Sequence, residues 1–411
     1  MTREGHWNDY ICRNLECMTM NWINDELVRL TEKSLERSLS VYSLAAGHPG
    51  HLRRGESRLL NLSSNDYLGL SGHAAIVAAM SESLLSEGAG SGASRLVTGN
   101  RAPYALLEQS LAQWQGKEAA LVFANGYMAN TGVIGALVSR RDVVFSDRLN
   151  HASIVDGITL SRAEHVRYRH NDPDHLTFLL NKHRDARRKL IVTDAMFSMD
   201  GDHALLRELV VLKQRHGAML MVDEAHSGGV YFARGEGLSH QLGVNEDVDV
   251  HMGTFSKSFG VYGAYVCGSR TLIRWLLNTA RPLVYSTALP PAVIAGISKA
   301  LELVQEEPWR RERLAALTKR FRASLCTAGF TVIDGDSPII PLIVGDNETA
   351  VRFSSDLQDE GIAAVAIRPP TVPNGTARIR YSISALHMEQ ELMEAAARIR
   401  RIGLKLGVLK S

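Results

Sequence analysis

The stretch AMLMVDEAHS, residues Ala218–Ser227, decides the fold class of this chain. Its first half is apolar without alternation, which is typical of a strand covered on both faces in a parallel sheet. Asp223 stands at the carboxyl end of this expected strand, and ligands of open α/β sheets bind at such ends. A carboxylate there can hold a metal, a ribose or a protonated ring nitrogen, or it can cap a helix.

Similar apolar runs lie on both sides of this stretch and alternate with helical segments. We expect strands at Ala119–Phe123, Val143–Phe145, Leu190–Thr193, Ala218–Val222, Val248–Gly253 and Ala264–Cys267. Short strands that alternate with helices form βαβ units. The sequence therefore predicts an α/β fold whose mostly parallel sheet is covered by helices on both faces.

The rest of the chain is expected to form smaller units around this sheet. Residues 1–20 match no pattern and are expected to be an extension of little structural weight. Residues 21–73 should form a segment with a helix at Ile23–Leu44 and a strand at Leu59–Leu62. Residues 74–290 should form the large domain, and residues 291–411 should form an α+β domain. In this last unit we expect a long helical region that is interrupted at Pro308, a helix around Ala350–Glu360 and a final helix from His387. The expected strands are Phe330–Ile333, Ile339–Val344, Ile362–Ile367 and Ile379–Ile383. The first and last units should pack together beside the large domain.

Composition excludes several classes of protein. With 46 basic and 44 acidic residues the net charge is +2, which offers no electrostatic basis for binding nucleic acid or an anionic membrane. No apolar run approaches the ~18 residues of a membrane span, and the polar N-terminus is not a secretory signal. The cysteines Cys12, Cys17, Cys267 and Cys326 lack metal spacing, so we expect no metal site and reduced thiols in a cytoplasmic protein.

A second strand end carries a lysine in an unusual setting. The expected strand Val248–Gly253 runs directly into TFSKSFG, residues Thr254–Gly260. Lysines usually lie on solvated helices, whereas Lys257 follows a buried strand and is flanked by hydroxyl groups and small residues. Partial desolvation lowers the pKa of a lysine and makes its amine nucleophilic. The hydroxyls of Thr254 and Ser256 could bind phosphate oxygens.

The two strand ends together fit the needs of pyridoxal phosphate. His226 follows Asp223 by three residues, and Lys257 follows it by 34. The cofactor needs an anion at its pyridine nitrogen, a lysine for its Schiff base and several donors for its phosphate. Asn125–Tyr127 lies between a strand and a helix, where backbone N–H groups suit phosphate. An ordinary turn would explain this tripeptide equally well.

With these residues in view, the chain resembles the α-oxoamine synthase family in the fold-type I class of pyridoxal-phosphate enzymes. The likeness runs from about residue 22 to 409, and its motifs follow one another at family-like spacing. The matching stretches are SSNDYLGL (Ser63–Leu70), GAGSGASRLVT (Gly88–Thr98), NGY (Asn125–Tyr127), DRLNHAS (Asp147–Ser153), FSMDGD (Phe197–Asp202), VDEAH (Val222–His226), TFSKSFG (Thr254–Gly260), YST (Tyr285–Thr287) and RPPTVP (Arg368–Pro373). The resemblance implies a seven-stranded, mostly parallel sheet, a smaller α+β C-terminal domain and an N-terminal helical segment.

The resemblance implies a role for each matching residue. Lys257 would carry the cofactor as a Schiff base and later act as general base. Asp223 would pair with the pyridine nitrogen, and His226 would contact the phenolic oxygen. His151 would stack on the ring and help to polarise the acyl thioester, with Ser198 beside the ring.

The phosphate group would be held by a second set of residues. The backbone N–H groups of Gly126 and Tyr127, together with Thr254, would bind it within one subunit. Ser286 and Thr287 match a pair that reaches the phosphate of the partner subunit. The resemblance therefore implies an obligate homodimer with shared active sites.

The substrate side of the site is also implied by the resemblance. Asn65 matches the residue near the amino-acid carboxylate, and Arg380 matches the arginine that binds it; without the family, Arg380 would be an ordinary surface charge. RPPTVP favours the branch that joins L-alanine to pimeloyl-CoA, or to a pimeloyl carrier thioester, with loss of carbon dioxide. Arg368 would receive the distal pimeloyl carboxylate or brace the site. Some members of the family carry a cluster of arginines in the first helix, and in this chain Arg37 alone lies near that position.

Three alternatives stay open beside this interpretation. A branch that joins glycine to acetyl-CoA shares features such as the C-terminal RIGLKLGV, residues Arg401–Val408. A partner subunit without activity would have lost the cofactor lysine, which this chain retains. A nicotinamide dehydrogenase would need its glycine-rich turn after the first strand, whereas Gly88–Gly92 precedes the first expected strand of the sheet, Ala119–Phe123.

Overall fold

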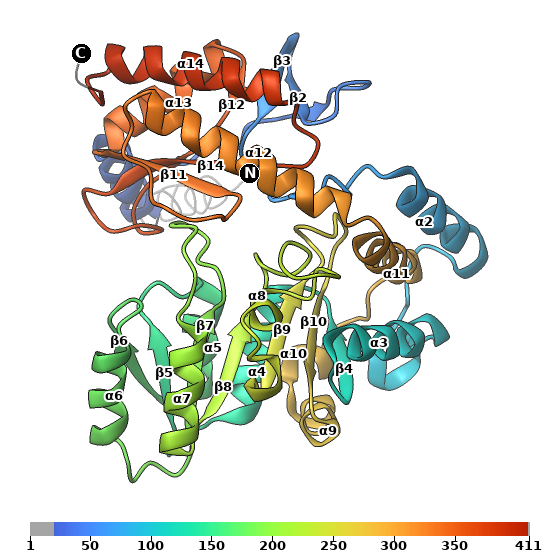
Figure 1. Ribbon diagram of the computed structural model, residues 1–411. Coiled ribbons are helices and arrows are strands. Elements are labelled where there is room, and N and C mark those ends of the chain that lie inside the picture. Colours follow the sequence, from blue (N-terminus) through green and yellow to red (C-terminus); the bar gives the residue numbers. More distant parts are fainter. Residues whose placement is uncertain (1–19, 410–411) are drawn as a thin grey trace, which may run out of the picture.

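The structure, a computed structural model, describes residues 20–409 of the chain (Figure 1). The expected extension at residues 1–20 therefore lies almost wholly outside the described part, together with Cys12 and Cys17. Cys267 is buried and Cys326 is exposed, and both are free. None of the described helices is both long and apolar enough to cross a bilayer.

A seven-stranded sheet forms the centre of the large domain, in the order β4-β10-β9-β8-β7-β5-β6. Only β10 runs antiparallel to its neighbours, β4 and β9, so the predicted mostly parallel sheet is confirmed. The strands are β4 (Ala119–Phe123), β5 (Val143–Asp147), β6 (Glu164–Tyr168), β7 (Lys189–Asp194), β8 (Met219–Asp223), β9 (Val250–Thr254) and β10 (Ala264–Gly268). The edge strand β6 was not predicted, because its sequence EHVRY is mostly polar.

Helices cover both faces of this sheet, as Figure 1 shows. They are α3 (Ala102–Gln115), α4 (Gly126–Leu137), α5 (Ala152–Ser161), α6 (Pro173–Lys182), α7 (Leu206–His216), α8 (Leu238–Gln241), α9 (Arg270–Thr279) and α10 (Arg281–Val284). α2 (Ala74–Glu87) lies apart from the sheet and packs against α11 (Pro291–Glu306). Side chains alternate along a strand, so Leu190 and Val192 of β7 join the core under α4 and α5, while Ile191 joins the core under α6 and α7. Both layers need apolar residues, which explains the unbroken apolar strands.

The N-terminal and C-terminal parts of the chain build two smaller sheets. One contains β1 (Ser43–Leu44), β2 (His51–Arg54), β3 (Ser57–Asn61) and β12 (Ile362–Ala363), and the other β11 (Ile339–Gly345), β14 (Ala377–Ser382) and β13 (Ala366–Ile367). The accompanying helices are α11 (Pro291–Glu306), α12 (Trp309–Thr327), α13 (Asn347–Asp359) and α14 (Glu389–Lys405). Because β12 pairs with β3, the two ends of the chain are joined. We propose that the N-terminal segment, the large domain and the C-terminal domain are divided at residues 73 and 290.

Three predicted elements of these smaller parts differ in the structure. The first helix ends at residue 32 rather than at Leu44: Ser34 has a φ of 51°, and the Leu35 N–H donates to the Leu30 carbonyl, which closes the last turn. Phe330–Ile333 is not a strand and contributes one bridge, between Val332 and Leu342. The expected strand Ile362–Ile367 is split between the two sheets.

Candidate active site

The candidate site lies at the carboxyl ends of neighbouring strands. Strand β8 ends at Asp223 and β9 ends at Thr254, three residues before Lys257. The two strands are paired, with Asp223 opposite Met252. The side chains that follow them therefore share one edge of the sheet.

Asp223 is a buried carboxylate with neutral hydrogen-bond partners. One oxygen accepts from the Asn130 side chain at 2.8 Å and the other from the Ala225 backbone N–H at 2.9 Å. Within residues 20–409 it forms no ion pair. A buried carboxylate is costly unless a cation or several donors compensate its charge. This site is therefore suited to a ligand that brings a positively charged N–H group.

A chain of hydrogen bonds connects Asp223 to His151. Asn130, on the inner face of α4, donates to Asp223 and also to the Ser153 hydroxyl at 2.9 Å. The Ser153 hydroxyl lies 2.7 Å from Nδ1 of His151, which caps α5. The backbone N–H of His151 donates to Asp194 at 2.8 Å. The imidazole that is expected to stack on a ring is thus oriented from two sides.

Lys257 is partly buried at this strand end. Burial lowers the pKa of its amine to about 8, although the carboxylates of Asp223 and Asp194 oppose the shift. An amine with this pKa is neutral far more often near pH 8 than an exposed lysine is, and it can act as a nucleophile or a base. A partly desolvated Lys257 therefore suits the role predicted for it.

His226 and Arg380 meet at the hydroxyl of Tyr67. The Tyr67 oxygen lies 2.7 Å from Nδ1 of His226 and 3.4 Å from Nη2 of Arg380. Burial, with the nearby charge of Lys257, holds the pKa of His226 well below its ordinary value. Burial likewise raises the pKa of Tyr67, so the phenol stays protonated. A neutral His226 that faces Tyr67 through Nδ1 has Nε2 available as a donor toward the site.

Arg380 is buried rather than on the surface. Its Nε donates to the Ser198 carbonyl at 2.6 Å, and Nη2 donates to Oδ1 of Asn65 at 3.1 Å. The structure therefore brings together Asn65 and Arg380, which are far apart in the sequence. A guanidinium beside an amide forms a binding site for a carboxylate.

The start of α4 is arranged to bind an anion. The Asn125 side chain caps this helix by accepting from the Met128 N–H at 2.9 Å, which leaves the first N–H groups, those of Gly126 and Tyr127, facing outward. A Cβ added at Gly126 would lie 3.9 Å from Thr254, so the two residues line the same space. The Thr254 hydroxyl donates to the Gly263 carbonyl at 2.8 Å.

Four predicted site residues form no hydrogen bond with this centre in the part of the chain that the structure describes. Ser286 and Thr287, which follow α10, line a small pocket together with Phe123 and Ala124, near the end of β4. Arg37 is exposed, and its Nη2 lies 3.4 Å from the Thr371 hydroxyl. Arg368 donates to the Ser34 and Glu36 carbonyls and so fastens the N-terminal segment.

The residues at the centre fit pyridoxal phosphate. The buried carboxylate of Asp223, which forms no ion pair within residues 20–409, suits a protonated pyridine nitrogen, and Lys257 supplies an amine with a lowered pKa. Oδ1 of Asn130 is buried without a hydrogen-bond partner within the described residues, so a polar group can still be received there. The start of α4 offers N–H groups for a phosphate.

Sequence reasoning missed several residues of the site. Tyr67 lies within SSNDYLGL, and Ser153 within DRLNHAS, but no role was predicted for either. Asn130 carried no signal apart from its position one helical turn after Gly126, on the inner face of α4. Asp194 ends β7 as Asp223 ends β8, and that parallel placement was the signal that could have revealed it.

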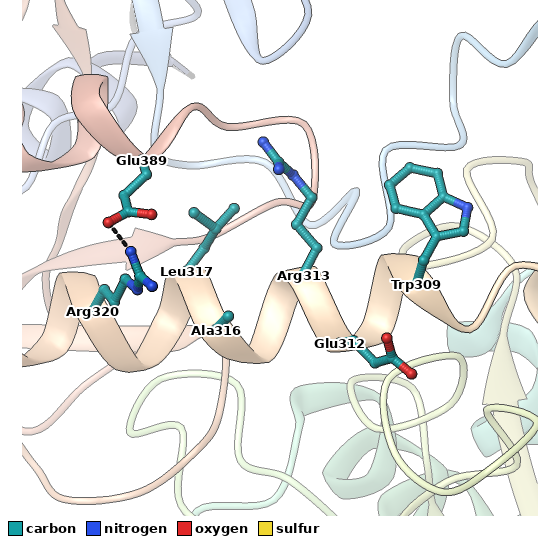
Figure 2. A pocket seen from close by; sticks show the side chains of 7 residues that line it. All are labelled: Trp309, Glu312, Arg313, Ala316, Leu317, Arg320 and Glu389. Atoms are coloured by element: carbon teal, nitrogen blue, oxygen red, sulfur yellow. Dashed lines mark hydrogen bonds and ion pairs between the residues drawn. The ribbon is translucent and has the colours of Figure 1, made fainter.

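An open groove elsewhere on the molecule contains none of these residues. Its volume is about 450 Å³, and it runs along α12 past the start of α14 (Figure 2). An ion pair between Arg320 and Glu389 crosses it, and Arg313 donates to backbone carbonyls. The charges of Arg313, Arg320 and Glu389 are therefore satisfied within the chain.

The chain is similar to known proteins over most of its length. The family model described as aminotransferase class I and II matches residues 57–399. A putative 8-amino-7-oxononanoate synthase from Halalkalibacterium halodurans is 50% identical over 390 residues, which cover 94% of this chain and 98% of that protein. An 8-amino-7-oxononanoate synthase from Anaeromyxobacter dehalogenans is 53% identical over 368 residues, which cover 90% of this chain and 92% of that protein.

Solved structures show the same fold. A serine palmitoyltransferase variant from S. paucimobilis, solved with a bound aldimine of pyridoxal phosphate and myriocin, superposes with a TM-score of 0.90 at 30% identity. The superposition covers 95% of this chain and 99% of that one. An 8-amino-7-oxononanoate synthase from Francisella tularensis superposes with a TM-score of 0.73 at 26% identity, over 85% of this chain and 99% of that one.

Proposed function

We propose that this chain, which belongs to the aminotransferase class I and II family and within it to the α-oxoamine synthases, catalyses the reaction of an 8-amino-7-oxononanoate synthase. It is a pyridoxal-phosphate-dependent acyltransferase. Its reaction joins L-alanine to pimeloyl-CoA, or to a pimeloyl carrier thioester, and releases carbon dioxide in a step of biotin biosynthesis. The observation that carries the proposal is the identity of about half of all residues with nearly full-length relatives of that name.

Arg380 and Asn65 would bind the carboxylate of L-alanine. The guanidinium of Arg380 is buried and already held by Ser198 and Asn65, so little conformational freedom is lost when a carboxylate binds. Charge-assisted bonds of this kind are stronger than neutral ones. Together the two residues would turn the Cα–H bond of alanine toward Lys257.

Asp223 and His226 would set the electronic state of the centre. When bound, pyridoxal phosphate draws in the electron pair that remains on the alanine Cα after a proton or carbon dioxide has left. Asp223 would keep a proton on the pyridine nitrogen by its negative charge. His226, neutral because burial lowers its pKa, would donate to the phenolic oxygen from Nε2.

Lys257 would move the protons of the reaction. Its amine would take the proton from the alanine Cα. This carbon then forms a bond to the thioester carbonyl carbon, while the carbon–sulfur bond breaks and the thiolate leaves. His151 would polarise that carbonyl. After the former alanine carboxylate has left as carbon dioxide, Lys257 would return a proton to the same carbon and release the amino ketone.

We also propose that two copies of the chain form a cytoplasmic homodimer with shared sites. Exposed apolar side chains gather around the segment that holds Ser286 and Thr287. Leu96, Val97 and Tyr285 are all exposed, and Thr287 forms a β-bridge with Ser94, just before the first two. An exposed apolar group of this kind supports a subunit interface, through which Ser286 and Thr287 would reach the partner's phosphate.

The acyl chain is tested by measuring thioester consumption by the purified, cofactor-loaded protein. L-alanine and glycine are each combined with pimeloyl-CoA and with acetyl-CoA. We expect turnover only with L-alanine and pimeloyl-CoA. Turnover with glycine and acetyl-CoA would replace the proposal by the acetyltransferase reaction, and no turnover with any pair would favour a non-catalytic partner subunit.

Arg37 is proposed to receive the distal carboxylate of the pimeloyl chain, while Arg368 braces the site. Burial and the charge of Arg37 lower the pKa of Arg368, and neither guanidinium forms an ion pair among residues 20–409. Two neighbouring cations without a carboxylate attract an anion. Arg368 already uses two nitrogens on backbone carbonyls, which leaves Arg37 free to bind.

The Arg37→Ala variant should raise the KM for pimeloyl-CoA about fivefold to tenfold and leave kcat within about twofold, because one charge-assisted contact is lost. Steady-state kinetics with pimeloyl-CoA measure this effect. Heptanoyl-CoA is the matched control, since it has the same chain without the distal carboxylate. An equal rise in KM for both thioesters would show that Arg37 does not bind the distal carboxylate.

A further inference from the structure

His170, in the loop between β6 and α6, bridges two carboxylates. Its Nδ1 lies 3.0 Å from Asp147 and its Nε2 lies 2.6 Å from Asp202. Both ring nitrogens therefore face acceptors, so both must carry protons. The ring also stands edge-on to Phe197, with centroids 4.5 Å apart. Burial alone lowers the pKa of His170, but the hydrogen bonds to both carboxylates overcome that effect and raise it to about 10.

Asn171 completes the same cluster. Its backbone N–H donates to Asp147 at 3.0 Å, and its side chain donates to Asp202 at 3.1 Å and to the His203 carbonyl at 2.9 Å. The cluster therefore ties the end of β5, where Asp147 stands, to the segment Phe197–Asp202. The two carboxylates belong to DRLNHAS and FSMDGD, and the proposed chemistry uses neither of them.

The segment Phe197–Asp202 supports the arginine that would bind the substrate. The Ser198 carbonyl accepts from Nε of Arg380 at 2.6 Å. Next to it, Arg378 donates to Asp200 at 2.5 Å and to the Met199 carbonyl at 3.3 Å. Strand β14 and the large domain meet at this segment. Its position therefore sets the position of the Arg380 guanidinium.

We propose that His170 is a positioning residue for the amino-acid substrate, because its two carboxylate contacts hold Phe197–Asp202 in place and so aim Arg380 at the substrate carboxylate. This inference rests on the proposed function in that Arg380 binds the carboxylate of the amino acid. Displacement of a binding group by about 1 Å is enough to weaken its contribution greatly. His170 itself is not one of the residues proposed to bind the substrate or the cofactor.

The test compares His170→Asn with the unchanged protein, both loaded with pyridoxal phosphate. Binding of L-alanine is followed by the change in cofactor absorbance without any thioester present. We expect the dissociation constant for L-alanine to rise at least about tenfold, while the dissociation constant for pyridoxal phosphate stays within about twofold. Asp202→Asn, which removes one of the two charges that His170 bridges, should shift alanine binding in the same direction.

Two controls separate this role from general stability. His183→Asn removes a histidine that stands edge-on to Phe145 and forms an ion pair with Glu164. Within the described residues His183 forms no hydrogen bond with Phe197–Asp202, so this variant should leave alanine binding unchanged. In an Arg380→Lys background, His170→Asn should have less than about a twofold further effect, because its target is already displaced.

The inference fails under three results. The first is that alanine binding stays unchanged in both variants, and the second is that it weakens together with cofactor binding. The third is that neither variant can be obtained folded, which would make the cluster structural only. None of these results depends on the acyl donor. If the unchanged protein binds glycine instead of L-alanine, the proposed substrate is wrong, and the same comparison with glycine still decides the role of His170.

Discussion

Changing Lys257 to alanine is expected to lower kcat by more than about 10⁴-fold, since both a general base and a nucleophilic amine are removed. Burial lowers the pKa of this amine to about 8, so it is available as a base near neutral pH. A methyl group can neither bond to the cofactor nor accept the proton of alanine. Steady-state turnover of L-alanine and pimeloyl-CoA by the purified variant measures the loss.

Lys117→Ala is the matched control for this prediction. Burial lowers the pKa of Lys117 as well, but its ammonium group donates to the carbonyls of Asn245 and Val248, away from the site. We expect kcat within about threefold of the unchanged protein. Appreciable turnover by clean Lys257→Ala protein would contradict the role of Lys257.

Asp223→Asn is expected to lower kcat by about 10²- to 10³-fold, the usual loss when a preorganised electrostatic contact is removed. The substitution keeps the shape of the side chain and removes its charge. An asparagine can still accept from the Ala225 N–H, and the Asn130 amide can turn so that its unpaired Oδ1 accepts from the new NH₂ group. The fold should therefore be retained, and the pyridine nitrogen should lose its proton.

The same variant needs a measurement of cofactor content beside its kinetics. We expect pyridoxal phosphate to remain bound, because Lys257 and the start of α4 are unchanged. If kcat falls by less than about fivefold while the cofactor content stays full, Asp223 does not control the protonation of the ring. Loss of the cofactor itself would assign Asp223 to binding instead of catalysis.

The large sheet could be predicted from the sequence because most of its strands are apolar throughout. Strands buried between two helical layers, such as β7 and β8, read as continuous apolar runs. The edge strand β6 has one polar face and therefore lacks a continuous apolar run, so it was not predicted. Ile362–Ile367 was predicted as one strand, because periodicity does not report that a chain changes from one sheet to another after two residues.

The centre of the site could be predicted only in part. Asp223 and Lys257 follow apolar runs, and strand ends in parallel sheets share an edge, so their proximity follows from the pattern. The contact between Asn65 and Arg380 spans 315 residues, and only the family resemblance placed them together. Tyr67 and Asn130 bridge residues of the candidate site, and His170 bridges two carboxylates beside it. Such a bridge depends on tertiary distances that no local pattern encodes.

The most direct test of the central claim is to find the residue that holds the cofactor. The protein loaded with pyridoxal phosphate is reduced with borohydride, which makes the bond between lysine and cofactor permanent, and its peptides are mapped by mass spectrometry. The account predicts one labelled residue, Lys257, and no label when that residue is alanine. A label on another lysine, or cofactor bound without any covalent label, would contradict it.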